Sequence, residues 1–273
     1  RGRDRFGPVN PEELAALSGT ETELHIPVEG GRTVHVYEEW PDHLLEKAAL
    51  VLNFHGGGFI KGRTDRDRRY CCTIMEQLNA LVWDVDYCVA PEEPFPAAVE
   101  EAYGIAAYAF DHAEELGIDP DKIILAGHSA GGNLVAAVCL KNAETHRLHP
   151  CCVLMEYFPT DNTVNPLRRL SPELQKDPFW AKRAETEKLY TDFYVGKADP
   201  ADPLCSPAKA ADEALASFPD SLILSAFVLR LVKAGVCVTA QRIPEAMHGF
   251  TTNRTPGWER ALALHCKFFR QHL

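Results

Sequence analysis

The 273-residue chain has the length of a single α/β domain, and its 46% apolar and 25% charged residues are typical of a globular protein. Its formal net charge of −11 argues against nucleic acid or an anionic membrane surface as a partner, because both bind basic faces. No apolar run approaches the roughly 20 residues of a membrane span, and the first residues show no apolar core of a secretory signal, so we expect a cytoplasmic protein.

The nine cysteines include two adjacent pairs, Cys71-Cys72 and Cys151-Cys152, which are poorly placed for a disulfide framework. None of the cysteines has the C-x2-C spacing of a metal site. We therefore expect reduced, mostly buried thiols, and we expect neither a metal nor an organic cofactor.

The chain is predicted to begin with an arm and a hairpin. Residues 1–21 are polar and contain proline and glycine, which indicates a short arm or helix over the active-site face. Residues 23–28 and 33–38 have strand patterns and are joined by Gly30-Gly31, which favours a hairpin. The continuous apolar run 48–54 is typical of a strand buried in a parallel sheet.

The run His55-Gly56-Gly57-Gly58-Phe59 follows this strand directly. Consecutive glycines free several backbone N–H groups to point into one concavity, which suits an oxyanion. A flexible loop or a phosphate cradle is the alternative. A phosphate loop needs Gly-Lys-Ser/Thr, however, and Lys61 lacks that spacing.

Strands and helices then alternate. A helix is expected over 67–78, a buried strand over 80–86, and a second helix from Pro96 to about residue 116. Residues 117–121 are expected to form a turn. Alternation of strands with helices predicts parallel crossovers and an α/β sheet.

The stretch 123–134 ends an apolar strand in Gly127-His128-Ser129-Ala130-Gly131 and continues into an alanine-rich helical pattern. This is the strand, tight turn and helix of a nucleophile elbow, in which the hydroxyl of Ser129 points out of the turn. Glycines on both sides let strand and helix approach each other closely. A plain turn is the alternative, but the flanking strand and helix favour a nucleophile.

Beyond the elbow, we expect strands over 151–158, 221–226 and 236–243 and an amphipathic closing helix over 258–271. Residues 159–207 are rich in proline, charge and aromatic side chains. A long insertion between strands usually carries function, so we interpret it as part of a cap.

In this order, the motifs resemble the hormone-sensitive-lipase-like family of α/β-hydrolase carboxylesterases, over residues from about 48 to the end. The matching residues are His55-Gly-Gly-Gly-Phe59, Asp86-Tyr-x-x-Ala-Pro-Glu-x-Pro-Phe-Pro-Ala-Ala98, Gly127-x-Ser-Ala-Gly-Gly132 and His248-Gly-Phe250. The resemblance implies one α/β-hydrolase domain over 1–273, with a mostly parallel eight-stranded sheet flanked by helices. It also implies a small helical cap, with elements at about 1–21 and 159–207.

The resemblance further implies that Ser129 is the nucleophile and His248 the general base. The oxyanion hole would be formed by the amides of Gly57, Gly58 and Ala130. The residue before the nucleophile, here His128, is more often acidic in the family. The last strand of relatives often pairs across a dimer, so a homodimer is possible here.

The acid of the triad is not evident. In the family it lies in a loop after the strand before the final one, but here strand 221–226 runs directly into the helical pattern that begins at Phe227. A parallel strand needs a loop before its helix. We therefore expect a loop missing between Ala226 and Phe227, with their Cα atoms more than ~3.8 Å apart if the two residues are not bonded. Asp161 is the fallback acid, and Glu245 is interpreted as a loop residue.

These features predict a serine carboxylesterase that hydrolyses short- to medium-chain acyl esters of small molecules through a Ser-His-acid triad. An amidase, formamidase or peptidase on the same fold is one alternative. A non-catalytic ligand-binding relative is another. A lipase acting at an interface would need a mobile amphipathic lid, which the charged insertion does not resemble.

Overall fold

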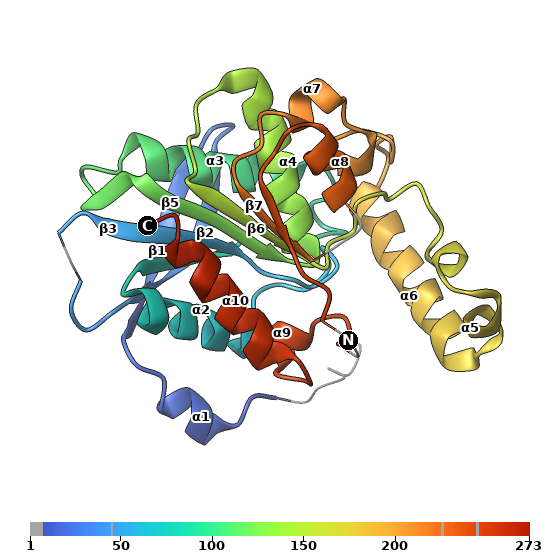
Figure 1. The fold of residues 1–273 in the computed structure, drawn as a ribbon, viewed down its shortest axis with the longest axis horizontal. Helices are drawn as coiled ribbons and strands as arrows, with labels where there is room; N and C mark the ends of the chain where they lie inside the picture. The colour runs from blue at the N-terminus through green and yellow to red at the C-terminus, as the bar shows by residue number, and fades with distance from the viewer. Residues whose placement is uncertain (1–7, 45, 225–226, 244–245) are drawn as a thin grey trace.

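We describe a computed structural model of the chain for residues 8–44, 46–224, 227–243 and 246–273 (Figure 1). One eight-stranded sheet forms its centre, in the spatial order β1-β2-β4-β3-β5-β6-β7-β8. The strands are β1 (Thr20–Val28), β2 (Arg32–Trp40), β3 (Ala48–Phe54), β4 (Leu81–Asp86), β5 (Ile118–His128), β6 (Cys152–Glu156), β7 (Ser221–Leu224) and β8 (Val238–Ala240). This confirms the predicted α/β-hydrolase fold.

Helices cover both faces of this sheet. In chain order they are α1 (Pro11–Ala15), α2 (Asp65–Leu78), α3 (Ala97–Asp111), α4 (Ala130–Thr145), α5 (Pro172–Lys176), α6 (Pro178–Val195), α7 (Asp212–Leu215), α8 (Val228–Lys233), α9 (Phe250–Asn253) and α10 (Trp258–Arg270), with short 3-10 turns at Pro166–Arg169 and Pro207–Lys209. None of the helices in the described ranges is long and apolar enough to cross a membrane. All nine cysteines are free thiols.

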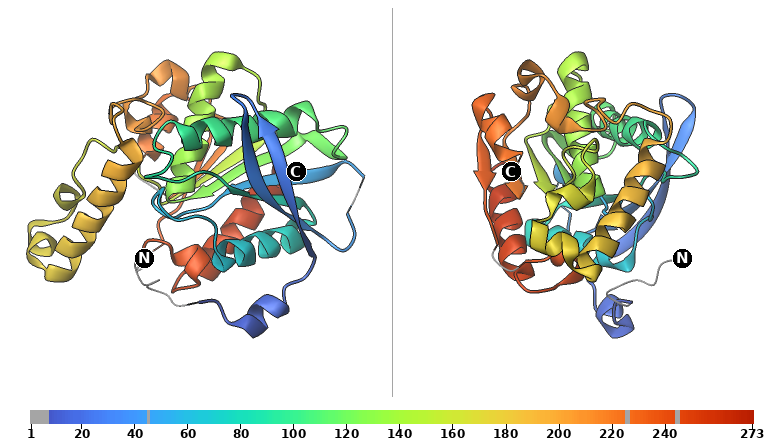
Figure 2. Two further views of the ribbon diagram at one scale, coloured as in Figure 1. Left: turned by 180° about the vertical axis from the view of Figure 1, so that it is seen from behind. Right: turned by 90° about the vertical axis from the view of Figure 1, so that its right-hand side faces the viewer.

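The strand directions divide the sheet into two parts. The pairs β1–β2 and β2–β4 are antiparallel, and the remaining neighbours are parallel. In the left view of Figure 2 the hairpin of β1 and β2 crosses the other strands steeply, as the twist of a large sheet requires. Because β3, β5, β6 and β7 are parallel, the segments that follow them meet at one edge of the sheet.

Two apolar cores lie on opposite faces of the sheet. Successive residues of a strand point to opposite faces, so Leu50 and Leu52 pack in the core shared with α3 and α4, while Val51 packs in the core shared with α2 and α10. Figure 1 shows α3 and α4 above the sheet and α2 and α10 below it. Strands buried on both faces are continuously apolar, which explains the sequence of β3.

Several boundaries differ from the sequence prediction, and among them α3 ends at Asp111 rather than at about residue 116. Residues 117–121 were expected to be a turn, but β5 begins at Ile118, which pairs with Ala48 before the register shifts in a bulge. Inside this bulge, the hydrogen bond typical of an aspartate turn still forms, because the amide of Asp121 donates to Asp119 Oδ1 (3.1 Å). Strand β8 spans only Val238–Ala240, rather than 236–243, because its neighbour β7 pairs with it only from Ser221 to Ile223.

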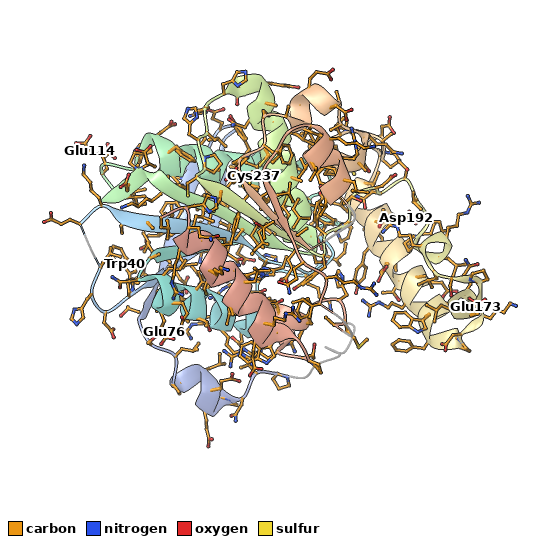
Figure 3. All side chains as sticks on the ribbon, viewed as in Figure 1. Trp40, Glu76, Glu114, Glu173, Asp192 and Cys237 are labelled. Atoms are coloured by element: carbon orange, nitrogen blue, oxygen red, sulfur yellow. The ribbon has the colours of Figure 1, made fainter. Side chains whose placement is uncertain are left out.

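The insertion 159–207 forms an arm. Helix α6 extends away from the sheet, with α5 at its outer end (Figure 1). Figure 3 places Glu173 at this outer end and Asp192 near the base. At the base, the ring of Tyr194 stacks on Phe59, with 3.6 Å between the ring centroids, and the Tyr194 carbonyl accepts from the amide of Phe95 (2.7 Å). The arm is therefore anchored to the glycine-loop side of the domain.

Helix α4 packs very closely against the end of β3. A Cβ atom added to Gly131 would lie far inside contact distance of the Phe54 carbonyl oxygen. Backbone cannot yield at such a contact, so only glycine allows the helix to start against the strand.

We expect Gly131→Ala to lower the free energy of unfolding by about 3 kcal/mol or more, because overpacking here outweighs the better helix propensity of alanine. The control is Gly117→Ala, where an added Cβ meets nothing within 4 Å but φ is +68°. That variant should lose only about 1 kcal/mol, the cost of a left-handed residue. Urea unfolding measures both values, and equal losses would contradict the close-packing argument.

Candidate active site

Ser129 lies at the bend between β5 and α4 in a strained backbone conformation. Its φ of 54° and ψ of −116° are rare for a residue with a side chain. Two backbone hydrogen bonds hold it there. Its amide donates to the Glu156 carbonyl (2.9 Å), and its carbonyl accepts from Asn133 (3.2 Å). The hydroxyl is thereby directed out of the turn, as the elbow motif predicts.

His248 lies opposite this hydroxyl, on the segment before α9. Its Nε2 atom is 2.8 Å from Ser129 Oγ, although 119 positions separate the two residues in the sequence. The imidazole packs edge-on against Tyr157, with 4.9 Å between the ring centroids. The fold thus brings together the two side chains that the sequence proposed as nucleophile and base.

The surroundings of His248 favour its neutral form. Although part of the ring opens to solvent, desolvation by the surrounding protein lowers its pKa, and the positive charge of Arg183 lowers it further, to about 4; Glu187 opposes this shift. A neutral imidazole can accept a proton from Ser129, so at neutral pH the pair is in the form that a general base requires.

The glycine loop lies against the elbow. Gly57 (φ +137°) and Gly58 (φ +65°) have backbone conformations that side chains rarely adopt. Within the described ranges, the amides of these two glycines donate no hydrogen bond. His55 is buried and fixes the start of the loop by stacking on Tyr87, whose hydroxyl donates to the His55 carbonyl (2.8 Å). The loop therefore presents unpaired donors from a fixed backbone.

Ala130 provides a further candidate donor. It is the first residue of α4, where helix amides lack partners within the helix and the helix dipole favours negative charge. Ala130 itself is fully buried. The glycine loop lines the same cavity as Ser129, and Ala130 follows Ser129 directly in the chain, so the oxyanion hole of Gly57, Gly58 and Ala130 stays a prediction.

Ser129 and His248 line a cavity of about 740 Å³, which the glycine loop and one side of α6 enclose. Arg183, Glu187 and Tyr190 come from this helix. Sequence reasoning singled out none of them as site residues, yet their i, i+4, i+7 spacing is the pattern of one helix face. The described part of residues 1–21 contributes nothing to the cavity lining, whereas 159–207 contributes many residues.

Asp161, the fallback acid, is engaged elsewhere. One carboxylate oxygen accepts from the amide of Thr163 (2.9 Å), and the other lies 3.0 Å from Lys209 Nζ. In the part of the chain that the structure describes, no carboxylate hydrogen-bonds to His248. The expected break between Ala226 and Phe227 involves residue 226, and Glu245 is the other acid near His248 in sequence; both residues lie outside the described ranges.

One group of potential metal ligands lies beneath the elbow. Among the described residues, His128, Glu156 and His265 are the set whose ligand atoms all lie within 4.8 Å of one another. Burial raises the pKa of Glu156 to about 8 and lowers that of His128 to about 3, so desolvation favours the uncharged form of both.

Comparison with known proteins places this chain among the α/β-hydrolases. A family model described as the alpha/beta hydrolase fold matches residues 51–252. An arylesterase of Saccharolobus solfataricus is 30% identical over 213 residues, which cover 74% of this chain and 68% of the relative. Human hormone-sensitive lipase is 35% identical over 162 residues, or 59% of this chain and 14% of that protein.

Solved structures agree with this placement. A carboxyl esterase from the fungus Tuber melanosporum superposes with a TM-score of 0.84 at 25% identity, covering 98% of this chain and 89% of that one. An esterase from Pyrobaculum calidifontis gives a TM-score of 0.84 at 26% identity, covering 95% and 88%.

The chain spans only about half, 52%, of the length of an AB hydrolase superfamily protein of Schizosaccharomyces pombe, to which it is 32% identical over 64% of its own residues. Residues 51–252, which the family model matches, nevertheless contain the glycine loop, the elbow and His248. The chain belongs to the hormone-sensitive-lipase-like family of α/β-hydrolases.

Proposed function

We propose that the protein is a serine carboxylesterase that hydrolyses short- to medium-chain acyl esters through an acyl-enzyme. The observation that carries this proposal is the 2.8 Å separation of Ser129 Oγ and His248 Nε2, in a cavity that the glycine loop also lines. A substrate carbonyl bound in this cavity would have the nucleophile, the base and the glycine-loop donors beside it. The names of the relatives, among them arylesterase and carboxyl esterase, support ester substrates.

In the first step, Ser129 Oγ attacks the ester carbonyl carbon while His248 Nε2 accepts the hydroxyl proton. The carbonyl oxygen becomes an oxyanion, and the amides of Gly57, Gly58 and Ala130 stabilise it. The carbon–oxygen bond to the alcohol then breaks, and His248 returns the proton to the leaving alkoxide. The acyl group remains on Ser129.

Water removes the acyl group by the same route. His248 accepts a proton from water as the water oxygen attacks the acyl carbon, and the same amides hold the second oxyanion. Collapse of this intermediate releases the carboxylic acid and returns the proton to Ser129. These steps use only groups of the chain and water.

The triad acid remains a prediction. β7 ends beside β6 at the same edge of the sheet as the elbow, so a loop after β7 would place an acid near His248. Asp161 is disfavoured because both of its carboxylate oxygens already have partners. Without an acid, we expect turnover to be several orders of magnitude lower, while binding and oxyanion stabilisation remain.

Two alternative functions differ from an esterase in specific ways. An amidase, formamidase or peptidase would use the same Ser129–His248 pair and differ in how the leaving group is bound. A non-catalytic binding relative would have no need of a neutral imidazole at 2.8 Å from the hydroxyl. The cytoplasmic location and the homodimer stay predictions, the latter based on the edge position of β8.

We expect Ser129→Ala to reduce kcat for p-nitrophenyl butyrate by about 10⁴-fold or more, because the nucleophile is lost. Ser217→Ala is the control, since this exposed serine only bonds to the Ala214 carbonyl (2.8 Å). It should retain the wild-type rate. Equal rates for wild type and Ser129→Ala would remove Ser129 from the mechanism.

The acyl-chain preference is expected to follow from the cavity. Its volume of about 740 Å³ is within the range of small-molecule sites, and charged side chains of α6 line one wall. We expect kcat/KM for p-nitrophenyl esters to be highest between acetate and octanoate and at least about tenfold lower for palmitate, whose long chain would meet those charges. A preference for palmitate would instead indicate a lipase.

The pH dependence of kcat/KM should report the charges on α6. Because the base must be neutral and its pKa is lowered, we expect the acid limb of the profile to lie below pH 6.5. Arg183→Gln removes a positive charge and should move this limb to higher pH, whereas Glu187→Gln should move it to lower pH.

Lys188→Gln is the matched control, because Lys188 is exposed on the same helix and pairs with Asp192 (2.6 Å). It should leave the acid limb unchanged. Shifts of Arg183→Gln and Glu187→Gln in the same direction would contradict the electrostatic explanation. The substrate for all four proteins is p-nitrophenyl butyrate at constant ionic strength.

A further inference from the structure

A cluster of buried polar side chains lies directly beneath the nucleophile elbow, on the face of the sheet that packs against α2 and α10. His128 ends β5 and Glu156 ends β6, and the two are register partners in adjacent parallel strands. His265 reaches the same point from α10. All three are at least 99% buried. Three metal-ligating side chains from three elements therefore meet in the interior.

The ligand atoms of this cluster face one another. His128 Nε2 lies 3.2 Å from Glu156 Oε2, and His265 Nε2 lies 3.7 Å from Glu156 Oε1. Each oxygen of the carboxylate thus faces one imidazole. A tetrahedral zinc ion with bonds of 2.0–2.1 Å separates its ligands by about 3.3 Å, close to these two nitrogen–oxygen distances, and all the ligand atoms of the cluster lie within 4.8 Å of one another.

Several atoms in the cluster lack hydrogen-bond partners. They are His128 Nδ1, His128 Nε2, Glu156 Oε2 and His265 Nε2. Buried polar atoms without partners are costly and rare, so four in one place call for an explanation. A neutral imidazole can donate its own N–H to the carboxylate, but His265 Nε2 lies 3.7 Å from Glu156 Oε1, beyond hydrogen-bond distance, and both ring nitrogens of His128 lack a partner. A cation accepts lone pairs from all three.

Neighbouring side chains contact the proposed ligands and fix their orientation, as the outer hydrogen-bond partners of known metal sites do. The hydroxyl of Tyr70, on α2, lies 3.3 Å from His265 Nδ1. In the tautomer in which Nδ1 donates to Tyr70, Nε2 directs its lone pair toward Glu156. Thr251 Oγ1 donates to Glu156 Oε1 (2.6 Å) and fixes the carboxylate.

We propose that His128, Glu156 and His265 form a buried zinc-binding site beneath Ser129. Two imidazoles and one carboxylate are a ligand set that zinc uses in proteins. The ion joins the ends of β5 and β6 to α10. Through Thr251 it also connects to the segment that follows His248. Its role is to fix the segment that carries Ser129 relative to the segment that carries His248.

Two cavities adjoin the cluster. His128 lines the large cavity beside Ser129. On the other side, Tyr70 and Thr251 line a small cavity that also contacts Arg69 and Arg254. Both of these arginines pair with Glu13, which reduces the positive charge that an incoming cation meets.

The test is zinc binding by the whole chain. The protein is treated with a chelator, equilibrated with micromolar ZnCl2, separated from free metal and measured for zinc per chain. Wild type should retain about one zinc, and a hundredfold excess of zinc over Kd should raise Tm by about 5 °C. Glu156→Gln and His265→Leu should each bind zinc at least about a hundredfold more weakly.

The control variant is the double substitution His25→Gln and His35→Gln. These two exposed or half-exposed imidazoles stack on each other at the surface, 4.7 Å between centroids, with Glu23 3.1 Å from His35. They are the nearest surface equivalent of the buried set. The double variant should retain the full zinc content and the Tm shift.

Cobalt substitution of the wild type makes the test independent of how the variants fold. Co²⁺ in the site should give visible absorption of a four- or five-coordinate ion without a thiolate charge-transfer band. Such a band would assign the metal to cysteines and overturn the proposal. Failure of wild type to retain zinc would also overturn it, as would unchanged zinc binding by Glu156→Gln.

Discussion

The site depends on one backbone constraint, which is the tight bend at Ser129. The residue adopts a positive φ, and the helix that follows starts so close to β3 that no side chain fits at Gly131. Such strain persists only where the surrounding structure enforces it. Here the Glu156 carbonyl and the first turn of α4 provide that enforcement. The bend then gives Ser129 its exposure and places helix-start amides beside it.

The charge state of His248 is the second property on which the site depends. The imidazole of His248 is kept neutral by desolvation and by Arg183, a residue of the inserted arm. The arm is therefore more than a steric cover, because its charges reach the base directly. Glu187 lies one turn from Arg183 and 3.0 Å from it, and its negative charge raises the pKa of His248 in opposition to Arg183. A substitution on α6 can therefore change the protonation of the pair without touching either member.

The polar cluster of His128, Glu156 and His265 lies in the interior of the domain, beneath the elbow. A domain of this size normally fills the space between sheet and helix with apolar side chains, as α2 and α10 do elsewhere on this face. At the ends of β5 and β6, polar residues replace them directly under the strained bend. We infer that the cluster secures the segments that carry Ser129 and His248, with zinc as the group that satisfies it.

The sequence by itself determined the fold class and the order of strands and helices, and it indicated Ser129 at the elbow. These follow from local patterns, since apolar runs, glycine spacing and the elbow motif act over a few residues. His248 was expected only from the resemblance to the family. The sequence also anticipated that residues 159–207 would reach the site.

Only the tertiary structure decided which side of α6 lines the cavity and that Asp161 is occupied by Thr163 and Lys209. It alone brought His265 to His128 and Glu156, a grouping that the sequence did not indicate. His265 lies more than a hundred residues from both of its partners, and Lys209 lies 48 residues from Asp161. Strand pairing and helix packing create these contacts, and no local pattern in the chain encodes such distances.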